Sequence, residues 1–101
     1  MGIHVQLKKE SGEVLAEVCD PKMVLSRATH SKFSHTRLLR YLVPWGDAIF
    51  NQVQAGDLTS DIAKVKSDYP NTPLSKLLLE IEPLVERLAS ETHLYLWFVG
   101  D

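Results

Sequence analysis

Two segments of alternating side chains open the sequence. In residues 3–8 apolar and polar side chains alternate, and Val14, Ala16 and Val18 resume the period of two in residues 14–18. This period is typical of β-strands that bury one face. Segment 9–13 joins them and contains Gly12, which can adopt the positive φ that a tight turn requires. The N-terminal residues therefore predict a β-hairpin.

A short helix and a third strand are predicted next. Asp20 can accept hydrogen bonds from the N–H groups of a first helical turn, and Pro21 suits the first helical position. This helix should extend as far as Ser26. Residues 28–35 show no period and predict a loop. Residues 36–43 are apolar on much of both faces and end before a proline, so they predict a buried strand.

Two further helices are predicted in the middle of the chain. The turn at residues 44–47 offers Asp47 as the N-cap of a helix that ends at Gly56. Asp57 can cap the following helix, which Pro70 ends. Each helix has apolar residues that it would bury. These residues are Ile49, Phe50 and Val53 in the first helix, and Leu58, Ile62, Val65 and Tyr69 in the second.

The strongest helical period follows Thr72 and Pro73, a pair suited to a helix start. Apolar residues then recur on one face, so a long amphipathic helix is predicted. Pro83 lies within it and lacks an N–H group, which predicts a kink or a break there. The predicted buried residues are Leu74, Leu77, Leu78, Ile81, Leu84, Val85 and Leu88.

The C-terminal residues 93–99 are aromatic and aliphatic, which is typical of a strand in the centre of a sheet. The predicted order of elements is therefore ββαβαααβ, within a single domain over residues 1–101. This order predicts an α+β fold, with a small, largely antiparallel sheet of about four strands and helices packed on one face.

Alternation along the strands also predicts which side chains share the opposite face of the sheet. If residues 3, 5 and 7 contact the helices together with residues 94, 96 and 98, the intervening side chains point away from them. Arg40 could join that face from the third predicted strand, and Arg37 is an equal candidate. The remaining members would be His4, Gln6, Lys8, His93, Tyr95 and Trp97.

An uncovered face with Tyr, Trp, His and Arg has the composition of a protein-recognition surface. The competing interpretation is that loop 28–35 or one helix covers the face, which would make these residues ordinary packing. Trp45, in the turn at residues 44–47, is a further candidate for partner binding, because recognition residues gather on turns. Its structural alternative is to pack at the start of the helix that follows.

Charge disfavours a general nucleic-acid binder. The chain has 11 Lys and Arg against 13 Asp and Glu, a formal net charge of −2, whereas affinity for phosphates needs clustered cations. The main alternative function is nevertheless a single-stranded nucleic-acid platform, in which Tyr95 and Trp97 stack bases while Lys8 and Arg40 hold phosphates. Another alternative is a small ligand-binding protein or enzyme with a pocket of His4, His93 and Arg40.

Motifs for metal binding or catalysis do not stand out. The four histidines are not spaced with Cys or carboxylate partners as in common metal sites, so no metal and no cofactor is predicted. Asp20 disfavours a thiolate at the adjacent Cys19, which is expected to be an inert, partly buried thiol. Phosphate-binding loops and the nucleophile elbow are also absent from the sequence, so we expect no enzymatic activity.

Cysteine content and hydropathy suggest where the protein acts. A single cysteine allows no internal disulfide, which favours a reducing compartment, and the N-terminus shows no targeting peptide. The longest apolar run, residues 94–99, is far below the ~20 residues of a membrane-spanning helix, so no membrane contact is expected. The sequence thus predicts a cytoplasmic domain of bacterial type that binds another protein. It could be an immunity or antitoxin-like inhibitor, or an adaptor, and homo-oligomerisation stays open.

Overall fold

The N-terminal hairpin is present as predicted. In the computed structural model, which describes residues 2–100, β1 (His4–Lys9) pairs antiparallel with β2 (Val14–Val18). Gly12 lies in the connecting turn with a φ of 94°, a value that favours glycine. The register shifts between Leu7 and Lys8, so a bulge interrupts the ladder at this point.

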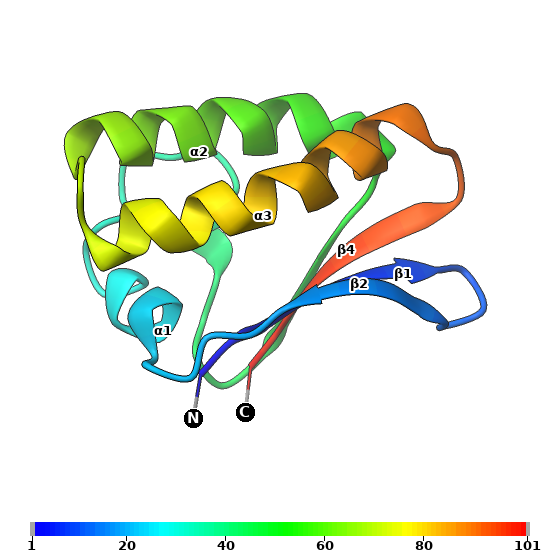
Figure 1. Cartoon of the computed structure of the whole chain (residues 1–101), viewed down its shortest axis with the longest axis horizontal. Helices are drawn as coiled ribbons and strands as arrows, with labels where there is room; N and C mark the ends of the chain where they lie inside the picture. Colours follow the sequence, from blue (N-terminus) through cyan, green and yellow to red (C-terminus); the bar gives the residue numbers. More distant parts are fainter. Residues whose placement is uncertain (1, 101) are drawn as a thin grey trace.

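The sheet has four strands in the order β2-β1-β4-β3, and every neighbouring pair is antiparallel (Figure 1). β4 (Leu94–Val99) pairs with β1 on one side and with β3 (Asp47–Phe50) on the other. The apolar C-terminal strand is therefore interior, as its composition predicts. This arrangement confirms the α+β fold with an antiparallel sheet.

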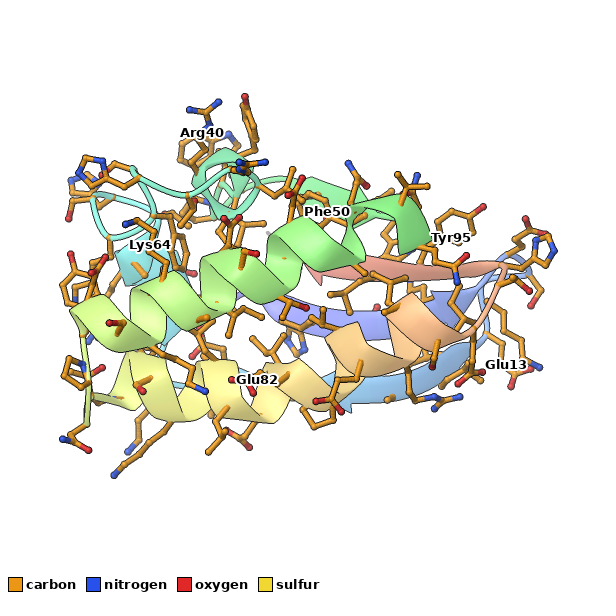
Figure 2. All side chains as sticks on the ribbon, turned by 90° about the horizontal axis from the view of Figure 1, so that it is seen from above. Glu13, Arg40, Phe50, Lys64, Glu82 and Tyr95 are labelled. Atoms are coloured by element: carbon orange, nitrogen blue, oxygen red, sulfur yellow. The ribbon has the colours of Figure 1, made fainter. Side chains whose placement is uncertain are left out.

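The helices cover one face of the sheet. α3 (Pro73–Ser90) packs against β1, β2 and β4, and α2 (Ala55–Asp68) packs against α3. Figure 2 shows these two helices side by side above the sheet. The short α1 (Val24–Ala28) lies beside α3, near the chain termini (Figure 1). One apolar core fills the space between the two layers.

The core contains the side chains that the two periods predict. The inward residues of β1 and β4 are buried, as is the whole predicted face of α3. Phe98 of β4 contacts Phe50 of β3 edge to face, with ring centroids 5.7 Å apart. Phe33 brings loop 28–35 into this same core. The buried residues of β1, its N-terminal neighbour and β4 are Ile3, Val5, Leu7, Leu94, Leu96 and Phe98.

The long C-terminal helix begins as predicted. Thr72 Oγ1 accepts a hydrogen bond from the backbone N–H of Ser75 at 3.2 Å, and Pro73 occupies the first turn. α3 is not divided at Pro83, which is exposed within one continuous helix. The buried residues on both sides of the proline, such as Ile81 and Leu84, hold the two halves against the same core.

The third strand lies elsewhere than predicted. Residues 36–43 are a loop that includes the 3₁₀ helix η1 (Leu39–Tyr41), so the predicted strand there is wrong. The buried carboxylate of Asp61 accepts hydrogen bonds from the backbone N–H groups of residues 37, 38 and 39. A strand would need those groups for its ladder, and the aspartate binds them instead.

The predicted helix after Asp47 is also wrong, because these residues form β3 along the free edge of β4. Ile49 is 47% exposed and Val53 is 91% exposed, so neither is buried as expected, whereas Phe50 is. The next element is the 3₁₀ helix η2 (Gln52–Gln54). If η2 is counted as a helix and η1 is not, the elements follow one another in the predicted order ββαβαααβ.

Two helix starts differ in detail from the prediction. Gly56 lies inside the first turn of α2 and ends no helix, because α2 already begins at Ala55. Asp20 does accept hydrogen bonds from the N–H groups of Val24 and Leu25, at 2.8 and 2.7 Å. Since α1 begins only at Val24, Pro21 lies outside it.

Candidate protein-binding face

The sheet face opposite α2 and α3, which we name the open face, has no helix over it within residues 2–100 (Figure 1). The burial of the strand residues agrees with this: in β1 and β4 the side chains that face the helices are buried, while those that face the other way are half-buried or exposed. Loop 28–35 does not cover the open face, because its Phe33 packs in the core on the other side. The open face consists of His4, Gln6, Lys8, Val14, Glu17, Asp47, Ile49, Tyr95, Trp97 and Val99.

Trp97 lies at the centre of the open face. The strand register aligns Glu17, Gln6, Trp97 and Ile49 in one row across all four strands. The Nζ atom of Lys8 lies 4.2 Å from the centroid of the Trp97 ring, which is a cation–π contact. Trp97 therefore has an aliphatic neighbour on one strand and polar neighbours on the other, and these contacts restrain its ring.

A shallow pocket of about 480 Å³ adjoins Trp97 on the open face. Trp97, Tyr95 and Ile49 contribute its apolar lining, and Lys8 and Glu10 contribute charged groups. The Tyr95 hydroxyl donates to Glu10 Oε1 at 3.3 Å, which fixes the aromatic ring at the edge of the pocket. An apolar floor with a charged rim is the usual arrangement of a site for a partner's side chain.

The two histidines that the sequence assigned to this face lie far apart. His4 pairs with Val99, whereas Lys9 pairs with Leu94, the residue after His93. The histidines thus lie at opposite ends of the β1–β4 ladder, about 20 Å apart along the strand direction. The prediction that His4 and His93 lie close to each other across paired strands is therefore wrong. His93 precedes β4 with a φ of 61°, is exposed, and has its Nδ1 atom 3.2 Å from Glu10 Oε1.

Neither candidate arginine lies on the open face, because the strand predicted to carry them does not exist. Arg40 belongs to η1, and its Nη2 atom donates to the Tyr41 hydroxyl at 2.9 Å. Figure 2 shows Arg40 well separated from Tyr95. The guanidinium of Arg37 forms an ion pair with Asp57 of α2, with 3.4 Å between Nη1 and Oδ1. The predicted pocket of two histidines and Arg40 is therefore not assembled.

Trp45 is 74% exposed in the loop between η1 and β3. No helix starts beside it, so the expected packing role at a helix start is wrong. Together with Arg27, His30 and Leu42 it lines a separate pocket of about 430 Å³. Trp45 is thus an exposed aromatic residue outside the open face.

The structure also assembles a group that sequence spacing did not reveal. Ligand atoms of His4, Glu17 and Cys19 all lie within 4.8 Å of one another. Gln6 Nε2 donates to Glu17 Oε2 at 2.5 Å, and Cys19 Sγ lies 3.7 Å from Glu17 Oε1. The sequence offered one clue to this group: Glu17 and Cys19 are two residues apart, so their side chains point to the same face of a strand. The register of the hairpin, when extended by one residue, places His4 opposite Cys19.

Hydrogen bonding and charge shift two pKa values in this group. The hydrogen bond from Gln6 lowers the pKa of Glu17. Partial desolvation, followed by the neighbouring Glu17 carboxylate, raises the pKa of the Cys19 thiol. Cys19 is exposed, which corrects the expectation that it is partly buried. The carboxylate that contributes to this shift is Glu17, whereas the sequence analysis named Asp20.

Comparison with known proteins gives no family. No protein-family model, no curated protein and no solved structure matches this chain. None of the helices within residues 2–100 is long and apolar enough to cross a membrane.

Proposed function

We propose that this chain is a non-enzymatic protein-binding domain whose open face docks onto a partner protein. The supporting observation is the position of Trp97, at the centre of a sheet face that α2 and α3 leave uncovered. Tryptophan and tyrosine are enriched among the residues that dominate binding energy, because they bury a large area with few rotatable bonds.

The surroundings of Trp97 support a protein partner. Ile49 and Tyr95 extend the apolar centre, while charged groups of both signs, including Lys8 and Glu17, lie around it. An aromatic centre within a polar rim is the usual organisation of a protein–protein interface. Docking here would occlude the partner's surface, as expected of an immunity or antitoxin-like inhibitor acting in the cytoplasm.

A nucleic-acid platform is less well supported than a protein-binding face. The Lys8 amine already lies over the Trp97 ring, where a base would have to stack. Arg40, the second expected phosphate ligand, belongs to η1 and lies well separated from Tyr95 (Figure 2). The net charge of −2 also lacks the excess of cations on which such binding depends.

The test compares immobilised wild-type protein with two variants in one cell lysate, followed by quantitative mass spectrometry. Trp97→Ala removes the centre of the open face, and Leu79→Ala removes an exposed leucine of α3 as the matched control. A true partner should be retained by wild type and Leu79→Ala and lost by Trp97→Ala.

Calorimetry with the purified partner should then show that Trp97→Ala weakens binding by about 2 kcal/mol, or about thirtyfold in Kd. Unchanged affinity in a folded Trp97→Ala protein would refute the proposal. If the partner has an enzymatic activity, stoichiometric addition of the domain should inhibit it. An active complex would identify an adaptor rather than an inhibitor.

A further inference from the structure

The group of His4, Glu17 and Cys19 has the geometry of an incomplete tetrahedral metal site. Zn²⁺ binds His nitrogen, carboxylate oxygen and Cys sulfur at about 2.0–2.3 Å, so tetrahedral ligand atoms lie about 3.3–3.8 Å apart. The three ligand atoms here lie within 4.8 Å of one another. Small side-chain rotations, without backbone movement, would close that difference, because all three side chains are exposed.

The hairpin provides a rigid base for this group. Val5 pairs with Val18, and Cys19 follows directly after β2, so an extension of this register places Cys19 opposite His4 and on the same side of the sheet as the open face. Glu17 is two residues before Cys19 and points to the same side. Ligands that arise from paired strands are positioned more accurately than ligands on loops.

Gln6 orients the carboxylate as an outer-shell partner would. Its amide donates to Glu17 Oε2, which leaves Oε1 directed at Cys19 Sγ. Ligands of bound metals are commonly held by such second hydrogen bonds, which fix the side chain that coordinates the ion.

Space for a further ligand adjoins the group. His4 and Cys19 line a cavity of about 360 Å³ next to the hairpin, together with Met23. Three protein ligands and one open position that water fills are the usual composition of a reactive zinc site, whereas structural zinc sites have four protein ligands.

We propose that His4, Glu17 and Cys19 form a binding site for a divalent transition metal such as Zn²⁺, with water as the fourth ligand. Binding replaces the thiol proton of Cys19 with the metal, and that proton passes to solvent. The neutral imidazole of His4, the carboxylate of Glu17 and the thiolate of Cys19 are then the ligand types that an ion of borderline softness such as Zn²⁺ binds. This inference does not depend on the proposed docking of a partner on the open face.

The experiment titrates fully reduced protein with CoCl₂, because Co²⁺ bound to thiolate gives a near-ultraviolet charge-transfer band. Wild type should saturate at one metal per chain, and ZnCl₂ should then abolish the band by displacing Co²⁺. Cys19→Ser should lose the band, and His4→Gln and Glu17→Gln should each bind about tenfold more weakly or worse. Gln6→Leu should weaken binding by about 10–100-fold, as for other outer-shell partners.

His93→Gln is the matched control. His93 is also an exposed histidine beside a glutamate, but Cys19 lies at the other end of the hairpin from this pair. It should bind Co²⁺ like wild type. As a second readout, Zn²⁺ at a concentration near the wild-type Kd should slow the reaction of Cys19 with a disulfide reagent clearly more in wild type than in His4→Gln. The proposal is overturned by the absence of a saturable band, by equal binding in wild type and His4→Gln, or by saturation at one metal per two chains.

Discussion

Asp61 is a buried polar residue that attaches a loop to the helical layer. It is 3% exposed on α2, and its carboxylate accepts three backbone hydrogen bonds from residues 37, 38 and 39, at 2.9, 2.7 and 3.2 Å. These bonds attach loop 36–43 to the helical layer and satisfy N–H groups that precede or begin η1. We expect replacement of Asp61 to be among the most destabilising changes in the chain.

The magnitude follows from the bonds that are lost. A hydrogen bond to a charged group contributes about 1.5–3 kcal/mol, and a buried N–H left without a partner costs about 1–3 kcal/mol. The three bonds share one carboxylate and are not additive, and water can enter the space that Ala leaves. Asp61→Ala should therefore lower the free energy of unfolding by about 3–5 kcal/mol, a large part of the about 5–15 kcal/mol typical of a domain.

Asp57→Ala is the matched control, one turn earlier on α2. Asp57 pairs with the side chain of Arg37, which is 77% exposed, so its loss should cost less than about 1 kcal/mol. Urea denaturation followed by circular dichroism gives both values. Hydrogen exchange should also show that the amides of residues 37–39 lose protection only in Asp61→Ala. Equal urea midpoints for the two variants would refute the reasoning.

Three further predictions concern core packing, an ion pair and the open face. Leu78→Ala should destabilise by about 2–5 kcal/mol because it truncates a buried side chain, and an unchanged urea midpoint would show that the site is not core. Arg87→Ala should raise the pKa of Glu91 in an NMR titration, because Arg87 holds it low through a hydrogen bond. A carboxyl group whose pKa is lower in the folded than in the unfolded protein stabilises the fold at pH values above the unfolded-state pKa. Wild type should therefore be more stable than this variant at neutral pH, and the difference should vanish as the pH falls through the lowered pKa of Glu91. With Trp45 replaced by Phe, acrylamide should quench the fluorescence of Trp97, and Trp97→Ala should lower the free energy of unfolding by only about 1–2 kcal/mol. A Trp97 indole shielded from acrylamide, together with a larger loss of stability, would mean that the open face is covered.

Sequence by itself determined the elements that depend on neighbouring residues. The hairpin, α3 and β4 follow from periods of two and about 3.6 residues, which record burial on one face. Strand parity also predicted correctly that Tyr95 and Trp97 point away from the helices. These inferences succeeded because each needs only the local chain and one buried side.

Tertiary structure alone decided the segment from residue 36 to residue 54. Residues 36–43 are apolar enough for a strand, but Asp61, more than twenty positions away, binds their N–H groups. Residues 47–50 became β3 because β4 offered a free edge. Long-range partners of this kind override local propensity, and no period within the segment records them.

Tertiary structure decided most of the candidate sites for the same reason. Arg40 left the open face when its strand was lost, and antiparallel register sent His4 and His93 to opposite ends of one ladder. The same register brought His4 toward Glu17 and Cys19, although more than ten residues separate them in the chain. Residue types determined which chemistry was available, while strand pairing determined which of those residues could act together.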